Sequence, residues 1–370
     1  MNVFIQFEKK PLYFTRPRKV ISCHDPSKFD EAWGQIEEFL SAGYYIAGFL
    51  SYEAGYGLEE KLRTQTAHDF PLLLMGAYRV PQASGLEGIA SGGFKVRGLH
   101  LNISKDDYAA NIARIRAFIA RGDVYQITYC LKLLFDLHGN PRRLFQELFS
   151  YQPVLYPAYL EAERFKVLSL SPERFLKKTG RTLLSEPMKG TWRRGQNVLS
   201  DLLARRRFMQ DVKNKAENVM IADLLRNDLG RIASAIAVPK LFTVTGYRTL
   251  FQMTSTVTGR LSGDRTLKDI FTATFPSGSV TGAPKIRAME IIRMIEREER
   301  KIYTGAIGYI TPVGDLYFNI PIRTVLIEGH RAEMGIGGGI VWDSTAQSEW
   351  DEGLLKARFL TDLSREPFNG

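Results

Sequence analysis

Cysteine is nearly absent from this chain of 370 residues, which contains only Cys23 and Cys130. Neither belongs to a CxxC pair, so the sequence argues against a disulfide-rich scaffold and against a thiolate metal site. Such scarcity is typical of a protein in a reducing compartment. The first ten residues also lack the basic and then apolar layout of a secretory signal peptide. We therefore expect a cytoplasmic protein.

Long apolar runs and nucleotide-binding motifs are missing as well. No stretch approaches the roughly 18 consecutive apolar residues of a membrane-spanning helix, so we expect no membrane association. The chain has no GxxxxGK[ST] loop, and its glycine run at residues 337–339 lacks the GxGxxG spacing. The five histidines are scattered along the sequence, which argues against a zinc site.

Negative charge is in deficit, because 50 lysines and arginines outnumber 40 acidic residues and give a net charge of +10. A basic balance can indicate a nucleic-acid-binding protein. Most of these charges alternate in sign, however, and residues 293–301 resemble a solvated helix face. Only residues 192–194 and 205–207 form basic clusters. Because basic surfaces also attract small polyanions and acidic subunits, nucleic-acid binding is kept only as the less favoured alternative, and we expect no nucleic-acid partner.

The arrangement of apolar residues predicts an α+β fold. A length of 370 residues indicates one large domain or two closely packed halves. Apolar spacing predicts helices over residues 28–40, 104–121, 211–230 and about 346–363. The helix over 211–230 is expected to bury Val212, Ala216, Val219, Met220 and Leu224. Alternating or β-branched runs predict strands over 42–50, 124–131, 166–176, 303–311, 316–327 and 331–336, with a glycine-rich strand over 335–341. The strand over 166–176 is expected to be interrupted at Ser171-Pro172-Glu173, because proline favours an edge or a bulge. Helices mixed with antiparallel hairpins favour the α+β class.

The segment from Ser185 to Thr191 places Lys189 between Pro187 and Gly190. Proline fixes φ and glycine admits unusual backbone conformations, so we expect a tight loop. A lysine that is desolvated in such a loop has a lowered pKa and a nucleophilic amine. The alternative interpretation is a solvated surface lysine, since most lysines are exposed.

Three glutamates form a candidate metal site. Glu349 and Glu352 are three residues apart and share one face of a predicted helix, whereas Glu217 lies on another helix. If the two helices meet, their carboxylates suit Mg²⁺, which binds through one or two carboxylates, substrate oxygens and water. The alternative is three surface glutamates with local lysine partners, such as Glu352 with Lys356.

Other segments are suited to anion binding. Arg323 interrupts an apolar strand, and an inward guanidinium would need a carboxylate or a similar anion. Tyr309 on the preceding strand could face the same anion, although an edge arginine and a core tyrosine are equally consistent with the pattern. Residues 275–285 form a Gly/Ser/Thr-rich loop that leads into a helix and presents backbone N–H groups. The glycine-rich strand at 335–341 indicates close approach of a ligand to the backbone.

Together these motifs resemble the chorismate-utilising enzymes over residues 104–363, and more weakly over 48–56. The shared motifs, in chain order, are Tyr125-Gln126, Ser171-Pro172-Glu173, Pro187-Met188-Lys189-Gly190-Thr191, Ala216-Glu217-Asn218, residues 226–231, the 275–285 loop, Ile322-Arg323-Thr324, residues 337–341 and the helix with Glu349, Glu352 and Lys356. The resemblance implies one large α+β fold with two facing antiparallel β-sheets and outer helices. Residues 1–100 would be an N-terminal α/β part of the same compact fold, and residues 101–370 the chorismate-binding catalytic domain.

The resemblance also implies a role for each matching position. Glu217 and Glu352 would be Mg²⁺ ligands, with Glu349 in the outer shell, and the metal would hold the ring carboxylate of chorismate. The enolpyruvyl carboxylate would be held by Tyr309, Arg323 and the backbone of Gly337. The remaining substrate contacts would come from Gln126, Gly190, Thr191, Ser279, Gly339 and Lys356. Glu173 would be the general acid and base near the C4 hydroxyl.

Two positions separate the activities within this family. Isochorismate and salicylate synthases have lysine where Gln126 stands, so those activities are disfavoured. Anthranilate synthases have alanine where Lys189 stands, whereas Lys189 resembles the nucleophile of aminodeoxychorismate synthases. In those enzymes the lysine adds at C2 and expels the C4 hydroxyl, and ammonia then adds at C4 to give 4-amino-4-deoxychorismate for p-aminobenzoate and folate synthesis. Amination at C2, as in anthranilate synthase component I, is the alternative.

The resemblance further implies an ammonia-supplying partner, because no glutaminase-like segment is recognised in the sequence. We therefore expect a separate glutamine amidotransferase subunit. Four positions depart from the common pattern of the family: Thr128, Met188, Asn214 and Gln252. Asn214 replaces an outer-shell acid one turn before Glu217, which could weaken the affinity for Mg²⁺. None of the four changes Lys189 or Glu173.

Overall fold

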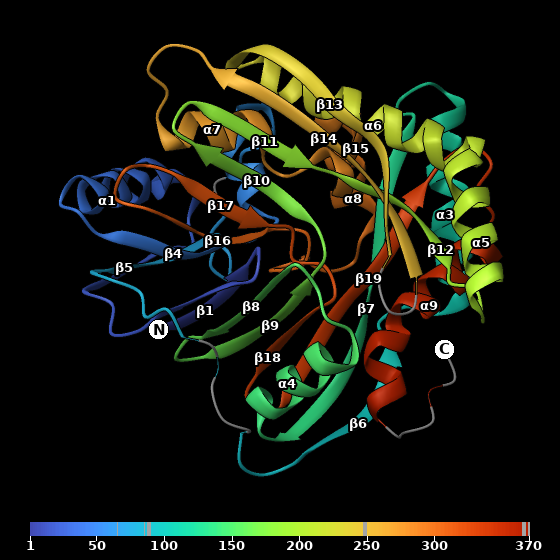
Figure 1. Ribbon diagram of the computed structural model, residues 1–370, viewed down its shortest axis with the longest axis horizontal. Coiled ribbons are helices and arrows are strands. Elements are labelled where there is room, and N and C mark those ends of the chain that lie inside the picture. Colours follow the sequence, from blue (N-terminus) through green and yellow to red (C-terminus); the bar gives the residue numbers. More distant parts are fainter. Residues whose placement is uncertain (65, 85, 87–89, 247–249, 365–367, 369–370) are drawn as a thin grey trace.

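The computed structural model describes residues 1–64, 66–84, 86, 90–246, 250–364 and 368. Two antiparallel β-sheets lie against each other and helices cover their outer faces (Figure 1). The expected α+β architecture is therefore confirmed. No helix in the described part of the chain is long and apolar enough to cross a membrane.

The first sheet has nine strands and is centred on the long pair β7 and β19. Its order is β15 (Gly282–Ala283), β7 (Gln126–Gly139), β19 (Arg331–Ile340), β18 (Thr324–Glu328), β9 (Phe165–Ser171), β8 (Tyr156–Glu161), β1 (Asn2–Phe7) and β2 (Lys10–Phe14), with β6 (Phe94–Leu101) also paired to β7. The register places Gly337 opposite Cys130 and Gly339 opposite Thr128. The glycine-rich end of β19 therefore lies beside the start of β7.

The second sheet has ten strands. Its order is β12 (Met188–Arg193), β14 (Leu250–Leu261), β11 (Thr182–Glu186), β10 (Arg174–Thr179), β17 (Leu316–Asn319), β16 (Ala306–Ile310), β4 (Tyr45–Leu50), β5 (Leu73–Tyr78) and β3 (Lys19–Cys23), with β13 (Ala233–Gly246) also paired to β14. One buried core contains apolar residues of both sheets, including Phe49 and Ile307 from the second and Val167 and Leu326 from the first. Both sheets also bury their other faces against helices.

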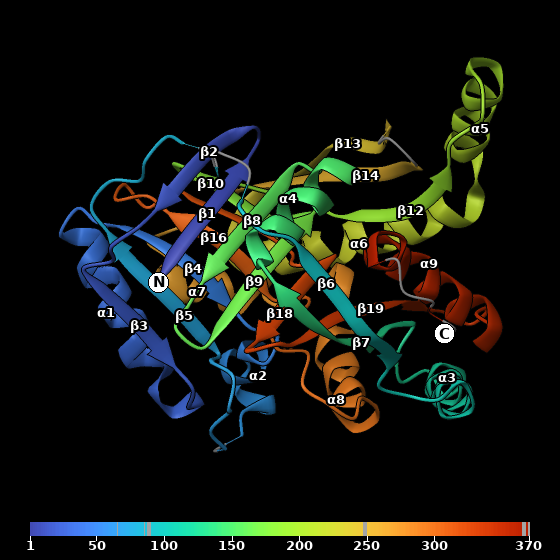
Figure 2. The same ribbon diagram turned by 90° about the horizontal axis from the view of Figure 1, so that it is seen from below.

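The helices divide between the two outer faces. The longer ones are α1 (Phe29–Ser41), α3 (Lys105–Ala120), α4 (Pro141–Tyr151), α5 (Val198–Gln210), α6 (Val212–Gly230), α8 (Lys285–Ile295) and α9 (Ala346–Ser364). The shorter ones are α2 (Ala54–Leu58) and α7 (Leu267–Thr274), with the 3₁₀ turns η1 (Pro26–Lys28), η2 (Glu60–Leu62) and η3 (Gly278–Val280). Apolar residues of α3, α8 and α9 pack with the first sheet, and those of α1, α6 and α7 with the second. Figure 2 shows α5 projecting away from the body of the molecule.

Proline residues mark two points where the chain crosses between the sheets. The expected strand over 166–176 is divided into β9 in the first sheet and β10 in the second, with Pro172 and Glu173 between them. The expected strand over 316–327 is likewise divided into β17 and β18, with Pro321 and Arg323 between them. Proline lacks the N–H that a ladder needs, which explains both interruptions. The two crossings therefore position two of the candidate residues.

The N-terminal segment contributes to both sheets, since β1 and β2 belong to the first and β3, β4 and β5 to the second. The division into parts at residue 100 stays a prediction. The short helix α2, which begins at Ala54, is buried throughout. A Cβ at Gly55 would lie 2.5 Å from the ring of Pro276, so glycine allows this helix to pack closely against the 275–285 segment.

Candidate active site

Lys189 lies on strand β12 at an irregular point of its pairing with β14. The register shifts between Lys189 and Thr191, and Gly190 between them has a φ of +84°. A Cβ at position 190 would lie 2.5 Å from Asn214 Oδ1 and 3.1 Å from the ring of Phe208. The expected tight loop is thus a strand with a bulge, and only glycine fits at its centre. The side chain of Thr191 lies outside the described structure.

Glu173 is buried at the crossing between the sheets, and its carboxylate accepts two hydrogen bonds. Ser279 Oγ donates to Oε1 over 2.7 Å and the Met188 N–H donates over 3.3 Å. Burial raises the pKa of Glu173 to about 7, although the Ser279 hydrogen bond and the charge of Lys189 act in the opposite direction. A carboxyl that titrates near neutral pH can both accept and donate a proton during one reaction.

The amine of Lys189 lies close enough to Glu173 for their charges to interact. Loss of hydration lowers the pKa of Lys189, although the carboxylates of Glu173 and Glu217 favour its charged form. Burial is therefore the stronger influence on this amine. A lysine with a lowered pKa beside a carboxyl with a raised one exchanges a proton at a lower free-energy cost than a solvated pair would.

The glycines at the end of β19 bring backbone close to these groups from another side. A Cβ at Gly339 would lie 2.5 Å from Gln126 Nε2 and 3.4 Å from Lys189 Nζ. A Cβ at Gly338 would instead lie 3.2 Å from Glu349 Oε2 and within 3.5 Å of the Glu352 and Lys356 side chains. The glycine strand thus runs between the Lys189 group and the acidic face of α9. Any larger residue would displace these side chains.

Glu217 on α6 lies close enough to Glu352 on α9 for their charges to interact, and Glu349 lies one turn before Glu352 on the same helix. On α9, Glu349 accepts from Ser344 Oγ over 2.7 Å, and Lys356 Nζ contacts both Glu352 at 2.7 Å and the carbonyl of Gly337 at 2.6 Å. On α6, Glu217 makes no hydrogen bond or ion pair to any residue that the structure describes. Burial raises the pKa values of Glu217 and Glu349, and the charge of Glu352 adds to both shifts.

This arrangement fits Mg²⁺ in its donor chemistry. Across the described residues, no three acidic, histidine or cysteine side chains are grouped closely enough to hold a metal by themselves. Mg²⁺ does not need such a cage, because it keeps several waters and uses only one or two carboxylates with substrate oxygens. Glu217 and Glu352 would hold the cation, which would relieve the repulsion between these carboxylates.

Tyr309 lies in an aromatic cluster between the two sheets, and Arg323 lies at the crossing between β17 and β18. The ring of Tyr309 stacks on Tyr317, with centroids 4.9 Å apart, and packs near Phe7 and Phe14. These two tyrosines are cross-strand partners on β16 and β17, which explains the stack. The carbonyl of Arg323 accepts a hydrogen bond from the N–H of Leu170. The clamp on the enolpyruvyl carboxylate by Tyr309, Arg323 and the Gly337 backbone stays a prediction.

Sequence reasoning missed one buried charged group beside the site. Residues 293–301 were interpreted as a solvated helix face, but Arg300 is only 3% exposed. It pairs with Glu296 through Nη2 and Oε1 at 2.6 Å, and α8 ends just before that glutamate. The sequence does contain a sign of this ion pair: Glu296 and Arg300 have opposite charges four positions apart, and the aromatic Tyr303 follows them. Solvated pairs share this spacing, so the sequence alone did not identify the buried one.

The fold agrees with comparisons to known proteins. A family model described as chorismate binding enzyme matches residues 86–362. Aminodeoxychorismate synthase component 1 of Klebsiella aerogenes is 36% identical over 253 residues, which are 68% of this chain and 56% of that protein. Anthranilate synthase component 1 of Lactococcus lactis is 36% identical over 266 residues, or 71% of this chain and 58% of that protein. The chain spans a little over half the length of these curated relatives.

Solved structures support the same grouping at the level of the fold. Anthranilate synthase component I of Streptococcus pneumoniae superposes with a TM-score of 0.81 at 24% identity, covering 98% of this chain and 92% of that one. A putative 2,3-dihydroxybenzoate-specific isochorismate synthase of Bacillus anthracis gives 0.80 at 17% identity, covering 97% and 95%. With the family model matching most of the sequence, the chain belongs to the family of chorismate binding enzymes.

Proposed function

We propose that the protein aminates chorismate at C4 to give 4-amino-4-deoxychorismate, as an aminodeoxychorismate synthase component. The observation that carries the proposal is the pairing of Lys189, whose pKa is lowered, with Glu173, whose pKa is raised to about 7. These opposite shifts favour transfer of the lysine proton to Glu173, which would give a neutral amine and a proton carrier at the same place. The match to the Klebsiella aerogenes protein supports the same activity.

The proposed reaction needs two displacements. Glu173 first takes the proton from the Lys189 ammonium. The amine then forms a bond to C2 of chorismate, the two ring double bonds shift, and the C4–O bond breaks. Glu173 returns its proton to the leaving hydroxyl, which departs as water. Ammonia then bonds to C4, the double bonds shift back, and the C2–N bond breaks to free Lys189.

Other side chains of the site would orient the substrate. Ser279 fixes the Glu173 carboxyl through its 2.7 Å hydrogen bond. Gln126 is buried, and its Oε1 has no hydrogen-bond partner among the described residues, so it can accept a hydrogen bond from a substrate group. Mg²⁺ bound at Glu217 and Glu352 would neutralise the ring carboxylate of chorismate.

Amination at C2, as in anthranilate synthase, is the second candidate. Its support is the 36% identity to the Lactococcus lactis protein, which equals that of the aminodeoxychorismate synthase relative. The two reactions differ in whether ammonia or Lys189 attacks C2. Lys189 Nζ lies near Gly339 and Glu173, and its position there supports attack by Lys189 over direct attack by ammonia.

Product analysis with ammonium salts tests the proposed function and its partner. We expect the purified chain to convert chorismate to a 4-amino product with ammonium and Mg²⁺, and to do so faster above neutral pH, where more free ammonia is present. Glutamine alone should give no product, because we propose that a separate glutamine amidotransferase supplies ammonia. Chromatography and mass spectrometry identify the product. A 2-amino product would contradict C4 amination, and glutamine-dependent turnover by the pure chain would contradict the need for a partner.

Metal removal tests the role of the converging carboxylates. Glu217→Gln and Glu352→Gln should each lower turnover by about 10²-fold or more while the fold survives, because a hard cation loses a charged ligand. Chelator should have the same effect on the unaltered chain. Mg²⁺ should stabilise the unaltered chain by RT ln(1 + [Mg²⁺]/Kd) and so raise its thermal midpoint. The rise in the midpoint should be smaller in either variant. Full turnover in chelator, or an unchanged Mg²⁺-induced shift in both variants, would refute the assignment.

A further inference from the structure

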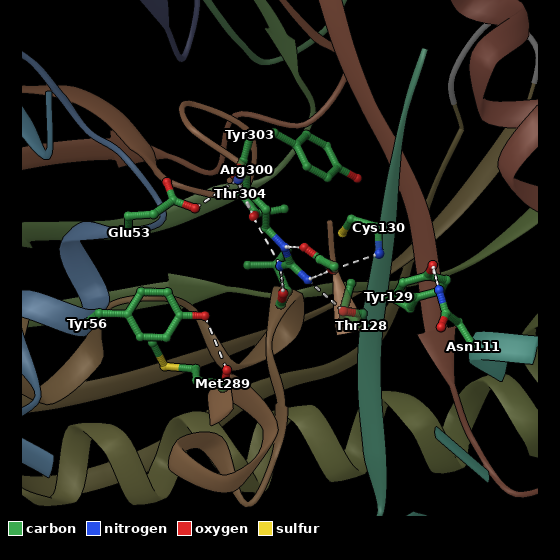
Figure 3. Close-up of polar contacts among 12 residues, drawn as sticks. Glu53, Tyr56, Asn111, Thr128, Tyr129, Cys130, Met289, Arg300, Tyr303 and Thr304 are labelled. Atoms are coloured by element: carbon green, nitrogen blue, oxygen red, sulfur yellow. Dashed lines mark hydrogen bonds and ion pairs between the residues drawn. The ribbon is translucent and has the colours of Figure 1, made fainter. Parts of the chain in front are cut away.

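Arg300 is buried among backbone carbonyls rather than exposed on a helix. Its Nη1 donates to the carbonyl of Val280 at 2.9 Å and to Thr304 Oγ1 at 3.3 Å, and its Nη2 donates to the carbonyl of Thr128 at 2.7 Å. Glu296 binds the same guanidinium in a bidentate manner, at 2.8 Å to Nε and 2.6 Å to Nη2. Figure 3 shows these bonds meeting at one side chain from several segments.

The carbonyls that Arg300 binds belong to two segments that carry active-site residues. Val280 follows Ser279 in η3, and Ser279 is the residue that donates to Glu173. Thr128 lies two residues after Gln126 at the start of β7. The N–H of Thr128 also donates to the carbonyl of Thr281 at 2.7 Å. One guanidinium therefore fixes η3 against β7, behind the reacting groups.

The surroundings of Arg300 require an arginine in particular. The ring centroid of Tyr52 lies 4.3 Å from the guanidinium carbon. The backbone N–H of Arg300 donates separately to Glu53 at 2.8 Å. Glu296 also accepts the N–H of Cys130 at 2.9 Å, which ties the ion pair to β7 a second time. The planar fork of arginine can serve two carbonyls and a carboxylate at once, which the single ammonium of lysine cannot.

We propose that Arg300 is a positioning residue that holds η3 and the start of β7 so that Ser279 stays hydrogen-bonded to Glu173 and Gln126 stays beside Gly339. Arg300 makes none of its described side-chain contacts to Glu173 or Lys189, so it acts through the segments that it fixes. This inference extends the proposed function. It rests on that proposal because it assigns Glu173 a part in the chemistry.

A double-mutant cycle between Arg300→Lys and Ser279→Ala tests this inference. Each single variant should lower kcat for chorismate consumption by about 10²-fold, the scale expected for misplacing a catalytic group. Both substitutions disturb the same hydrogen bond to Glu173, so their effects should not multiply. The kcat of the double variant should therefore lie within about twofold of the kcat of the slower single variant. A matched control is Arg293→Lys on the preceding helix α8, whose guanidinium contacts the Leu62 carbonyl and the Tyr56 ring outside the site. It should keep kcat within about twofold.

Thermal midpoints and near-ultraviolet circular dichroism show whether each variant is folded. If Arg300→Lys does not fold, Glu296→Gln replaces it, since it loosens the same guanidinium from the other side. Losses that multiply in the double variant, or a folded Arg300→Lys enzyme with full kcat, would overturn the inference. The assay follows loss of chorismate, so a product other than the 4-amino compound would contradict the proposed function without affecting this comparison.

Discussion

Replacing Lys189 by alanine is expected to abolish C4 amination while the protein stays folded. In the proposed mechanism, attack of the Lys189 amine at C2 is what expels the C4 hydroxyl, and alanine cannot make this attack. Formation of the 4-amino product should therefore fall by about 10³-fold or more, the scale seen when an enzyme loses its nucleophile. The space left beside Gly339 would admit ammonia to C2, and a small amount of 2-amino product should appear. Chromatographic separation of the two products measures both effects.

A matched control is Lys240→Ala, which removes an exposed lysine from β13. This variant should keep the rate and the product of the unaltered chain. If Lys189→Ala instead formed the 4-amino product at an unchanged rate, Lys189 would only position the substrate and ammonia would attack C4 directly.

Replacing Glu173 by glutamine should lower kcat by about 10²- to 10⁴-fold, the usual contribution of a general acid or base. Burial raises the pKa of this carboxyl to about 7, and only its ionised form can take the proton of Lys189. In the unaltered chain kcat/KM should therefore rise as pH increases through about 7. The residual activity of Glu173→Gln should lack this rise in kcat/KM near pH 7. A rise that persists in the variant would assign the titration to another group, such as Lys189.

The same substitution has a measurable effect on stability. Because the pKa of Glu173 is raised on folding, the stability linked to it is full below its unfolded pKa and is lost as pH rises through about 7. Ionising this buried carboxyl at pH 8 costs up to about 3 kcal/mol. Glutamine cannot ionise, so Glu173→Gln should gain in thermal midpoint relative to the unaltered chain as pH rises from 5 to 8. A constant difference across this range would show that Glu173 titrates normally.

The sequence was most informative where local chemistry restricts the backbone. Pro172 indicated an interruption of the strand over 166–176, but the pattern did not show a change of sheet there, nor the second crossing at Pro321. Pro187 and Gly190 indicated a restricted backbone around Lys189, which the structure shows as a bulged strand and not as a tight loop. The proximity of Glu173 to Lys189 was not derivable from spacing, because it depends on the pairing of β10 with β11, which places Arg174 opposite Glu186 and leaves Met188 N–H beside Glu173.

Helix α6 shows where periodicity misleads. The expected apolar face included Val212 and Val219, which are 80% and 40% exposed. The helix instead buries Asn218 and Asp228 on its inner face. Asn218 accepts a hydrogen bond from Ser255, and Asp228 pairs with Lys285 at 2.6 Å. Polar residues with partners on distant segments can be buried at little cost, and a single sequence does not reveal those partners.

The most direct test of the account is to look for chorismate bound covalently to Lys189. The protein is mixed with chorismate and Mg²⁺ in the absence of ammonia, quenched rapidly in acid, digested and analysed by mass spectrometry. We predict that the peptide containing Lys189 gains the mass of chorismate less one water, because the amine adds and the C4 hydroxyl leaves. Lys189→Ala should show no such gain. An unmodified Lys189 peptide from an enzyme that still forms the 4-amino product when ammonia is supplied would contradict the covalent mechanism.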